Sequence, residues 1–413
     1  MAPDPTFVII GAGLAGAKAA EALRDQGFDG RIVLLGDEPH RPYERPPLSK
    51  EYLSGKSERE QVFVHTAAWY GEHDVDLRTG QAATAIDRAA RQVTLADGGR
   101  VAYDKLLLTT GSSPRRLPVP GGDADGVHYL RTLGDSEQIK DTLGTASRIV
   151  VIGGGWIGLE VAAAARQADV EVTLIEAAEL PLLGVLGREA AQVFADLHRA
   201  HGVDLRCGVQ ITAITTDDRT GRATGVRLAD GTTVTADAVL VGVGISPNAQ
   251  LAADAGLDVD NGVLVDATLT TSDPGICAAG DVANALHPVL GVRVRVEHWA
   301  NALNQPAVAA ATMLGGQATY DRLPYFFTDQ YDLGMEYTGH VRPGAYDRVV
   351  FRGDTASREF IAFWCDGGRV LAGMNVNVWD VTEQIKALIG SGRPVDAALL
   401  ADPGHPLDQL TRG

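Results

Sequence analysis

The chain has 413 residues, enough for two or three domains, because a single hydrophobic core rarely grows past about 300 residues. Its apolar fraction of 45% and charged fraction of 22% are those of an ordinary globular protein and exclude a disordered or collagen-like chain. The formal charge of −17 disfavours nucleic acid as a partner, since phosphate binding requires a basic surface.

The N-terminal sequence, MAPDPTFVIIG, has no basic segment followed by a long apolar run and therefore does not look like a secretory signal. No apolar stretch reaches the roughly 18 residues that a membrane-spanning helix needs. The three cysteines, Cys207, Cys277 and Cys365, lie far apart and form neither a C-x-x-C pair nor a metal-ligand spacing. We therefore expect a cytoplasmic protein without membrane contact, with buried reduced thiols and no metal site.

The first predicted element is an apolar strand, TFVII at positions 6–10, followed by GAGLAG. The glycines of this G-x-G-x-x-G motif are Gly11, Gly13 and Gly16. A helix rich in small residues then extends to Gly27, and a second strand, RIVLLG, leads to Asp37. In a dinucleotide fold such glycines let the backbone approach a pyrophosphate at the helix N-terminus, and an acid after the second strand binds ribose hydroxyls. The complete unit therefore predicts a dinucleotide site.

Positions 41–53 read RPYERPPLSKEYL, a stretch dense in charge and proline. Because proline fixes φ, Pro46 and Pro47 predict a rigid, extended loop from which Arg45 and Lys50 project. Considered alone, Lys50 is most simply interpreted as a solvated loop lysine.

The pattern of strand, glycine turn and helix recurs at 147–176, in SRIVVIGGGWIGLEVAAAARQADVEVTLIE. The glycines of this second motif are Gly153, Gly155 and Gly158, and its second strand ends in Glu176. Two complete units imply two dinucleotide sites, most simply in a protein that passes a hydride between its two cofactors. A carboxylate at Glu176, where an NADP site needs a cation for the 2′-phosphate, favours NADH.

From about Leu323 the sequence alternates between apolar and polar residues, which predicts strands, with an Asp-Gly-Gly turn at 366–368. WDVTEQIKALIGSG then predicts a helix, with Asp380 and Glu383 at capping-box spacing and Gly390 at its end. The apolar face of this helix contains Ile385, Leu388 and Ile389. We expect an α+β domain of fewer than about a hundred residues.

Three segments in this order resemble the FAD-domain signatures of the two-dinucleotide flavoprotein reductases: GAGLAG, YDKLLLTTGSSPRRLP at 103–118 and TTSDPGICAAGDV at 270–282. PYERPPLSKEYL resembles the PY-x-RPPLSK segment of the oxygenase-coupled ferredoxin reductases and of apoptosis-inducing factor. The chain is thus similar, over nearly its whole length, to the FAD-dependent pyridine nucleotide-disulfide oxidoreductase superfamily. Within it, the chain is most similar to the group of the putidaredoxin, rubredoxin and biphenyl dioxygenase ferredoxin reductases.

This resemblance implies an α/β fold with two Rossmann-like dinucleotide-binding domains, the FAD domain being interrupted by the NADH domain, and a C-terminal α+β cap domain. The implied boundaries are 1–113 and 243–321 for the FAD domain, 114–242 for the NADH domain and 322–413 for the cap. Superfamily members that reduce disulfides carry a redox cysteine pair. Since this chain lacks such a pair, we expect electrons to leave from the flavin itself.

The resemblance places Arg45 near the adenosine half of FAD and Lys50 near the isoalloxazine, where its ammonium pairs with Glu160, the acid of GG-x-x-G-x-E, beside flavin N5. Lys50 and Glu160 are the catalytic candidates. Asp281 would accept hydrogen bonds from ribityl hydroxyls, and a position as helix N-cap before VANAL is compatible with this role. The backbone of Trp299 would contact the flavin, unless Trp299 is a core aromatic. The implied cofactor-binding residues are Gly11, Gly13, Ala15, Gly16, Asp37, Arg45, Lys50, Ala83, Gly111, Arg131, Gly280, Asp281, Trp299, Gly153, Gly155, Ile157, Gly158, Glu160, Glu176 and Gly244.

The sequence departs from the group at PYFFTDQY, where Tyr325 and Phe327 stand in place of common tryptophans. An aromatic residue is retained there, although an indole is not. A basic patch for an acidic partner is a further expectation. Its candidate residues are Arg293, Arg295, Arg342 and Lys386.

The implied function is that of an NADH-dependent, FAD-containing ferredoxin reductase. A hydride passes from nicotinamide C4 to FAD N5, and single electrons then pass to a [2Fe–2S] or [3Fe–4S] ferredoxin that supplies a cytochrome P450 or a ring-hydroxylating oxygenase. A monomer is favoured over a dimer. One alternative is an NADH-sensing signalling flavoprotein like apoptosis-inducing factor, although this chain lacks the long cap insertion of such proteins. Another is an NADH-dependent reductase of a small acceptor such as a quinone or monodehydroascorbate.

Overall fold

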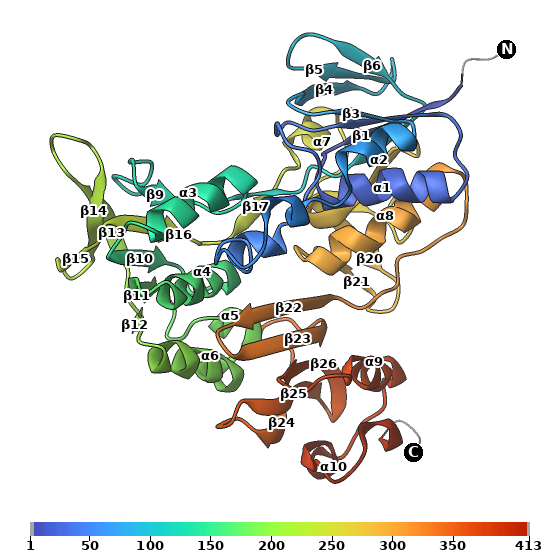
Figure 1. The fold of residues 1–413 in the computed structure, drawn as a ribbon. Coiled ribbons are helices and arrows are strands. Elements are labelled where there is room, and N and C mark those ends of the chain that lie inside the picture. Colours follow the sequence, from blue (N-terminus) through green and yellow to red (C-terminus); the bar gives the residue numbers. More distant parts are fainter. Residues whose placement is uncertain (1–3, 411–413) are drawn as a thin grey trace. The chain divides into compact units, whose positions relative to one another are not determined.

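The computed structural model describes residues 4–410 (Figure 1). These residues divide into two compact units. The first unit contains the chain up to Arg45 together with Glu58–Ser113 and Ile245–Arg322. The second contains Pro46–Ser57, Pro114–Gly244 and the described chain from Leu323 onward. Each unit is therefore assembled from three segments that are distant in sequence. The boundaries expected for the three domains stay a prediction.

A parallel five-stranded sheet forms the centre of the first unit, in the order β19-β7-β1-β2-β3. Its strands are β1 (Thr6–Ile10), β2 (Arg31–Leu35), β3 (Val75–Arg78), β7 (Lys105–Leu108) and β19 (Ile276–Ala278). Ile9, in the central strand, is fully buried and pairs in register with Leu34 and Leu107. Such continuous apolar strands are typical of a parallel sheet that is covered on both faces. The two strands predicted around the first glycine motif are both present.

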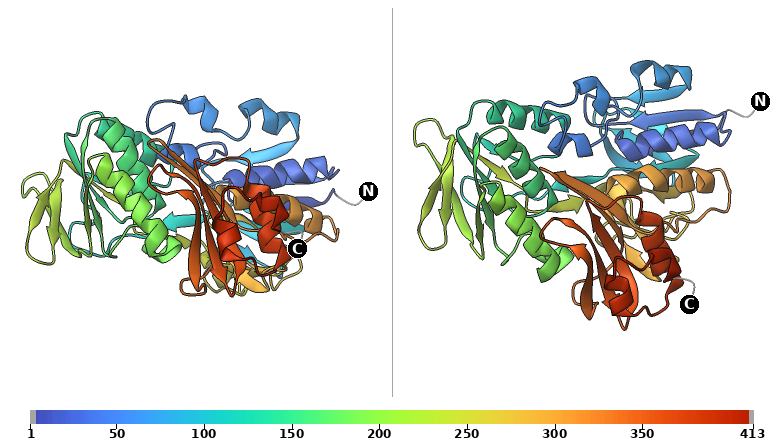
Figure 2. Two further views of the ribbon diagram at one scale, coloured as in Figure 1. Left: turned by 90° about the horizontal axis from the view of Figure 1, so that it is seen from below. Right: turned by 60° about the horizontal axis from the view of Figure 1, so that its bottom comes forward.

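Two helices of the first unit, α1 (Leu14–Asp25) and α8 (Trp299–Met313), lie side by side (Figures 1 and 2). Small buried side chains such as Ala17 and Ala20 let neighbouring elements approach α1 closely. The other helical elements are η2 (Arg59–Val62), α2 (Ala67–Glu72), α7 (Gln250–Asp254) and η3 (Gly280–Val282). Within residues 4–410, no helix combines the length and the apolarity that crossing a membrane requires.

Smaller sheets complete the first unit. They consist of β4 (Ala83–Asp87), β5 (Gln92–Leu95) and β6 (Arg100–Ala102), of β8 (Ser112–Pro114) with β17 (Ile245–Pro247), and of β18 (Val263–Val265), β20 (Ala283–His287) and β21 (Val292–Val294). The VANAL sequence thus forms most of β20, so the interpretation of Asp281 as a helix N-cap is wrong. Pairing with β18, in which Val263 lies opposite Ala283, overrides the weak helix preference of this stretch.

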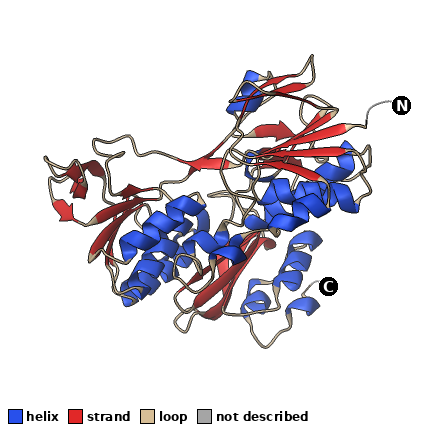
Figure 3. Ribbon diagram, turned by 45° about the horizontal axis from the view of Figure 1, so that its top comes forward, coloured by secondary structure: helices blue, strands red, loops and turns tan. Residues whose placement is uncertain are grey.

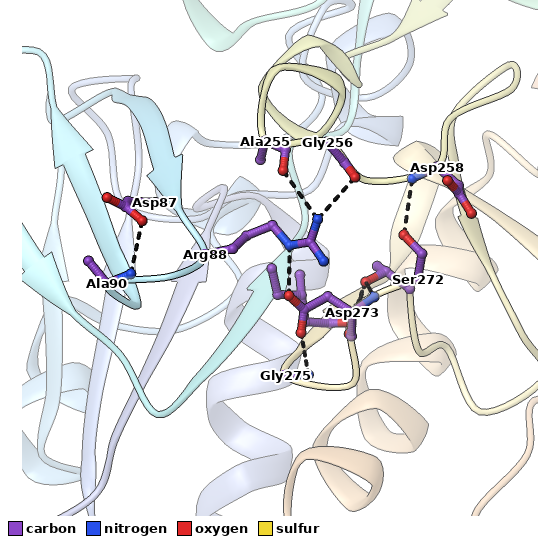
Figure 4. Close-up of polar contacts among 11 residues, drawn as sticks. Asp87, Arg88, Ala90, Ala255, Gly256, Asp258, Ser272, Asp273 and Gly275 are labelled. Carbon is purple, nitrogen blue, oxygen red and sulfur yellow. Dashed lines mark hydrogen bonds and ion pairs between the residues drawn. The ribbon is translucent and has the colours of Figure 1, made fainter.

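Arg88 joins distant segments of the first unit (Figure 4). It follows β4, and its Nε donates a hydrogen bond to Asp273 at 2.7 Å. Its Nη1 donates to the carbonyl oxygens of Ala255 and Gly256, directly after α7, at 3.4 and 3.0 Å. The last carbonyls of a helix lack intrahelical partners, so a guanidinium there is favourable. Arg88 therefore links two of the three segments that build the unit.

The second unit contains another parallel five-stranded sheet, in the order β12-β11-β10-β16-β9. Its strands are β9 (Val127–His128), β10 (Arg148–Ile152), β11 (Glu171–Glu176), β12 (Asp204–Cys207) and β16 (Ala238–Val241). A smaller antiparallel sheet contains β13 (Ile211–Thr216), β14 (Ala223–Leu228) and β15 (Thr233–Thr235). The helical elements are η1 (Pro46–Ser49), α3 (Leu133–Leu143), α4 (Trp156–Gln167), α5 (Leu183–Leu186) and α6 (Arg188–Ala200). The second predicted motif of strand, glycine turn and helix is therefore present, as β10, the turn at Gly153–Gly155 and α4.

The C-terminal part of the second unit is an antiparallel sheet with helices beside it (Figure 3). Its elements are β22 (Tyr325–Gln330), β23 (Leu333–Gly339), β24 (Arg348–Asp354), β25 (Glu359–Asp366), β26 (Arg369–Val376), α9 (Thr382–Ser391), α10 (Ala397–Ala401) and η4 (Leu407–Gln409). The predicted turn joins β25 to β26, and its glycines, Gly367 and Gly368, have φ values of +53° and +81°. Positive φ at both central residues is what a two-residue hairpin turn of type I′ requires.

The predicted ends of α9 are wrong. Asp380 has a φ of +63° and Val381 is the N-cap, so Asp380 and Glu383 do not form a capping box. At the other end the helix continues through Gly390 to Ser391, and Gly392 adopts the left-handed conformation. Because Gly392 offers this conformation at lower strain than other residues, it ends the helix two residues later than predicted.

Within the second unit, the parallel sheet and the C-terminal sheet share one hydrophobic core. Trp364 of β25 is fully buried, and its Nε1 donates a hydrogen bond to the Leu186 carbonyl of α5 at 3.0 Å. The ring centroid of Trp156 lies 5.4 Å from that of Phe194 and 5.1 Å from that of Phe326. The C-terminal segment is therefore an integral part of this unit.

Candidate active site

The first glycine turn connects β1 to α1 in the first unit. Gly11 has a φ of +116°, and a Cβ placed on it would lie 2.2 Å from the carbonyl oxygen of Thr109. A Cβ on Gly16 would lie 2.0 Å from the carbonyl oxygen of Gly11. Gly13 is the N-cap of α1, and among residues 4–410 no side chain caps this helix and no acid lies in its first turn. The first amides of α1 are thus open to an anion, which fits the pyrophosphate of FAD.

Two adjacent acids follow β2, and their environments differ. Asp37, the predicted ribose ligand, is exposed, whereas Glu38 is half-buried. Glu38 accepts a hydrogen bond from Arg45 at 2.9 Å and another from the hydroxyl of Tyr43. Glu38 was missed, although the adjacent acids of the GDE sequence were a signal for it. The guanidinium of Arg45 also lies 5.3 Å from the centroid of the Tyr43 ring.

The residues of the third FAD signature lie beside the first turn of α1. Gly280 has a φ of +79°, and a Cβ on it would lie 3.1 Å from the Cβ of Ala15. The carboxylate of Asp281 accepts a hydrogen bond from Ser112 Oγ at 3.1 Å. Trp299 is the first residue of α8 and is half-buried, and its Nε1 donates to Glu44 at 3.0 Å. The predicted FAD ligands of α1, η3 and α8 thus lie within the first unit, whereas Lys50 belongs to the second.

Two further predicted ligands occupy loop and strand ends of the first unit. Gly111 has a φ of +67°, and its carbonyl accepts a hydrogen bond from the amide of Asn248 at 2.9 Å. Ala83 is the first residue of β4 and is half-buried. A role for either residue in cofactor binding stays a prediction.

The second glycine turn connects β10 to α4 in the second unit. Gly153 has a φ of +101°, and a Cβ on it would lie 2.3 Å from the Gly242 carbonyl oxygen. A Cβ on Gly158 would lie 2.1 Å from the Gly153 carbonyl oxygen. Gly155 is the N-cap of α4, and no side chain in the described part of the chain caps the helix. The side chain of Ile157, in the first turn, is 41% exposed. This open helix N-terminus fits the pyrophosphate of NADH.

Glu176 lies against this second turn. Its Oε2 accepts a hydrogen bond from the Gly154 amide at 2.6 Å, and its Oε1 accepts one from the Ala178 amide at 2.7 Å. A carboxylate held here is in the place where a dinucleotide fold binds the adenosine ribose.

Two further predicted ligands lie in loops of the second unit. Gly244, with a φ of +97°, accepts a hydrogen bond from the Arg115 amide at 2.9 Å. Arg131 precedes α3, and its amide donates to Asp135 at 3.0 Å.

The structure brings Lys50 and Glu160 together in the second unit. Lys50 Nζ lies 2.7 Å from Glu160 Oε1, and the two side chains are only 8% and 4% exposed. The carboxylate also accepts hydrogen bonds from Ser49 Oγ and, at 2.6 Å, from Thr328 Oγ1. The Lys50 ammonium lies 5.4 Å from the centroid of the Phe327 ring. Lys50 is therefore not a solvated loop lysine, and Ser49 and Thr328 belong to its surroundings although the sequence reasoning missed them.

The conformation of the segment that precedes Lys50 differs from the predicted one. Pro46–Ser49 forms the 3-10 helix η1 and is not extended. The φ of proline, near −65°, fits a 3-10 turn as well as an extended chain, so the two prolines do not decide between them. Arg45 belongs to the first unit and Lys50 to the second, so the RPPLSK segment passes from one unit to the other.

Part of the predicted basic patch is already engaged within the protein. The Arg295 side chain is 9% exposed and forms an ion pair with Glu297, so its inclusion in the patch is wrong. Arg293 is exposed, but its guanidinium donates to the Val265 and Asn284 carbonyls. Because these two arginines are bound to groups of their own unit, their positions are explained by the fold and do not require a protein partner.

The three cysteines are free thiols, of which Cys277 and Cys365 are buried and Cys207 is partly exposed. Burial raises the pKa of the Cys277 thiol to about 12 and that of the Cys365 thiol to about 11. A protonated thiol is a poor nucleophile, so neither buried cysteine is suited to redox exchange at neutral pH. The expectation that all three are buried is wrong for Cys207.

The two open helix N-termini, their acids and the buried Lys50–Glu160 pair define an oxidoreductase that binds two dinucleotides. The chain belongs to the pyridine nucleotide-disulphide oxidoreductase family, which its sequence matches over residues 5–306, and residues 325–411 match the reductase C-terminal family. The predicted superfamily and the predicted fold class are therefore confirmed, as is the requirement for FAD and NAD(H).

Individual relatives agree with this assignment. The chain is 42% identical over 405 residues to the ferredoxin–NAD(+) reductase component of the anthranilate 1,2-dioxygenase system of Burkholderia cepacia, covering 98% of each chain. A crystal structure of the covalent putidaredoxin reductase–putidaredoxin complex superposes with a TM-score of 0.95 at 40% identity, covering 99% of both chains. The ferredoxin reductase for the CYP199A2 system from Rhodopseudomonas palustris gives a TM-score of 0.93 at 36% identity, covering 98% of this chain and 99% of the other.

Proposed function

We propose that this chain is an NADH-dependent, FAD-containing ferredoxin reductase. The observation that carries the proposal is the buried ion pair of Lys50 and Glu160, together with two open glycine turns in one chain. When bound, FAD supplies the exchange between a two-electron hydride and two single electrons. The side chains of the protein bind both cofactors, orient them and provide a fixed charge.

Each glycine turn binds one cofactor. In the first unit, the N-terminus of α1 holds the FAD pyrophosphate, Asp37 and Glu38 bind its ribose, and Asp281 accepts from ribityl hydroxyls. In the second unit, the N-terminus of α4 holds the NADH pyrophosphate. Glu176 accepts hydrogen bonds from the adenosine ribose, and its charge would repel a 2′-phosphate, which supports NADH as the donor.

Lys50 provides a fixed positive charge beside the reacting ring. Burial disfavours an ammonium ion, while a carboxylate at 2.7 Å favours it, so Glu160 keeps Lys50 charged away from water. A charge fixed before the reaction stabilises negative charge that develops on the cofactor without any rearrangement of water. Glu160 thereby acts through Lys50.

The electron acceptor is an iron–sulfur ferredoxin, with a [2Fe–2S] or [3Fe–4S] cluster, that supplies a cytochrome P450 or a ring-hydroxylating oxygenase. Relatives that serve a dioxygenase system and a CYP system support this assignment, as does the relative captured with putidaredoxin. The exposed Arg342 is a candidate for local attraction of the partner, because the net charge of −17 would repel an acidic ferredoxin. A cytoplasmic monomer is proposed, in keeping with three free thiols and with NADH as the reductant.

Stopped-flow absorbance tests the proposal. The purified flavoprotein is mixed anaerobically with NADH and then with a panel of [2Fe–2S] and [3Fe–4S] ferredoxins at low and high salt. We expect fast bleaching of the flavin, followed by rapid, salt-sensitive reduction of one ferredoxin. Slow bleaching into a persistent long-wavelength band, with no ferredoxin reduced, would favour a signalling flavoprotein. Rapid reduction of a quinone or monodehydroascorbate with no ferredoxin reduced would favour a small-acceptor reductase.

A further inference from the structure

A continuous chain of hydrogen bonds in the second unit ends on Glu160. Thr328 Oγ1 donates to Glu160 Oε1 at 2.6 Å, and Gln330 Nε2 donates to Thr328 Oγ1 at 3.2 Å. The carbonyl oxygen of Gln330 lies 2.9 Å from His198 Nε2, and His198 Nδ1 lies 3.4 Å from the Tyr331 hydroxyl. The chain connects α6, β22 and α4, three elements that are distant in sequence.

Each hydrogen bond in this chain has only one possible direction. An ionised carboxylate can only accept, so Thr328 must donate to Glu160 and its oxygen must accept from the Gln330 amide nitrogen. The Gln330 carbonyl therefore faces His198, whose Nε2 must carry the ring proton. His198 Nδ1 then accepts from Tyr331. Donors that all point the same way polarise one another and strengthen the final bond to the carboxylate.

The members of this hydrogen-bond chain are buried, so water cannot replace a lost partner. The exposed fractions are 0% for His198, 1% for Gln330, 1% for Thr328 and 4% for Glu160. A buried polar group that loses its partner cannot recover it from water, so each member holds the next in place. Burial also lowers the pKa of His198 to about 4, despite its hydrogen bond with Gln330, so the ring is neutral at physiological pH. A neutral ring is what the direction of the chain requires.

We propose that Thr328, Gln330 and His198 are positioning residues that hold Glu160 as a charged acceptor aimed at Lys50. The inference rests on the proposed role of Lys50 and Glu160 in the ferredoxin reductase. Ser49 and Thr328 donate to different oxygens of the carboxylate, which fixes its plane, and Lys50 binds the same oxygen as Thr328. Without the Thr328 hydroxyl, that oxygen loses a donor and the ammonium loses part of its orientation.

The test uses the holoenzyme and an isosteric pair of substitutions. Thr328→Val removes the hydroxyl, whereas Thr328→Ser keeps it. Thr338→Val is the matched control, because Thr338 is fully buried in the adjacent strand β23 and its hydroxyl has no hydrogen-bond partner among the described residues. The readouts are the midpoint potential of the bound flavin, the rate of its reduction by NADH and the thermal unfolding temperature.

For Thr328→Val we expect a more negative midpoint potential and a roughly tenfold slower reduction, as for loss of one hydrogen bond to a charged group. Thr328→Ser should restore both values, and Thr338→Val should leave both unchanged. Gln330→Leu should shift both in the same direction as Thr328→Val, and it decides the question if Thr328→Val fails to fold or to retain FAD. A chain that merely stabilises the fold would lower the unfolding temperature without moving the potential.

Wild-type potential and rate in folded Thr328→Val, or equal losses in Thr338→Val, would overturn the inference. Lys50→Met distinguishes failure of the positioning role from failure of the role proposed for Lys50 itself. If Lys50→Met is slow while Thr328→Val is normal, only the positioning role is wrong. If Lys50→Met itself reacts at the wild-type rate, the role proposed for Lys50 fails and the positioning role fails with it.

Discussion

The two glycine turns are built alike but differ in exposure. In α1 the first-turn residues Leu14 and Ala15 are buried, whereas in α4 the N-cap Gly155 is exposed and Ile157 is 41% exposed. A helix start with buried first-turn residues suits a cofactor that stays bound through many catalytic cycles. A more exposed helix start suits one that enters and leaves in each cycle, as NADH must. The same backbone motif thus serves a resident cofactor in one unit and an exchanging one in the other.

The fifth residue after each N-cap shows a second difference. In α1 this residue is Lys18, which pairs with Glu21 at 2.7 Å on the same helix, with side chains 25% and 31% exposed. In α4 it is Glu160, which is almost fully buried and pairs with Lys50, the residue that follows η1. The first pair belongs to the helix surface, while the second lies in the interior and carries the proposed chemistry.

The largest effect is expected from filling the first turn. Gly16→Ala would place a Cβ 2.0 Å from the Gly11 carbonyl oxygen, so the turn must deform. We expect purified Gly16→Ala to lose its FAD and at least about 3 kcal/mol of unfolding free energy. Gly158→Ala, the equivalent change in the second turn, should retain FAD but bind NADH weakly. Flavin absorbance and NADH titration measure both properties.

Gly71→Ala is the control for these variants, because a Cβ placed on this helical glycine would have no described atom within 4 Å beyond its chain neighbours and its own helix backbone. It should stabilise the protein by about 0.5–1 kcal/mol. Full FAD occupancy in Gly16→Ala would contradict the comparison between the two turns.

Breaking the buried ion pair should have the next largest effect. Lys50→Met removes the charge that Glu160 holds, and we expect FAD to stay bound while its reduction by NADH slows about 100-fold. The uncompensated carboxylate should also destabilise the protein by about 3–5 kcal/mol. Stopped-flow absorbance and chemical denaturation measure the two effects. In the double variant Lys50→Met/Glu160→Gln, stability should recover while the rate stays low; recovery of the rate would show that the charge is not needed.

Reversing the charge at the second turn should change the cofactor preference. Glu176→Arg replaces an acceptor of ribose hydroxyls with a cation that suits a 2′-phosphate. We expect the ratio of kcat/KM for NADH to that for NADPH to fall about 10- to 100-fold. Glu171→Arg, at the exposed start of the same strand, is the control and should leave the ratio unchanged. An unaltered ratio in Glu176→Arg would mean that this turn does not bind the nucleotide.

The smallest effect is expected at the surface pair of α1. Lys18→Met removes one partner of a pair three residues apart on a helix, which is worth about 0.5 kcal/mol or less. FAD content and the rate of reduction by NADH should be unchanged. If FAD in Lys18→Met were reduced by NADH as slowly as in Lys50→Met, the distinction between the surface pair of α1 and the buried pair of α4 would be wrong.

Much of the local structure could be predicted from short patterns. Both units of strand, glycine turn and helix are present because continuous apolar strands, glycines and small helix residues encode the backbone locally. Three local predictions were wrong: the helix at VANAL, the extended loop at 46–49 and the two ends of α9. Each concerned a short stretch compatible with two conformations, where pairing or packing with the rest of the unit decided the outcome.

The sequence by itself determined the two dinucleotide turns, and through the family resemblance it singled out Lys50 and Glu160. Only the tertiary structure identified Thr328 and Ser49 as further ligands of Glu160, from positions 168 and 111 residues away, and extended the chain to Gln330 and His198. Glycine turns are read from neighbouring residues because backbone conformation is a local property. Hydrogen bonds across such separations depend on how several helices and strands pack together, and no local pattern records that.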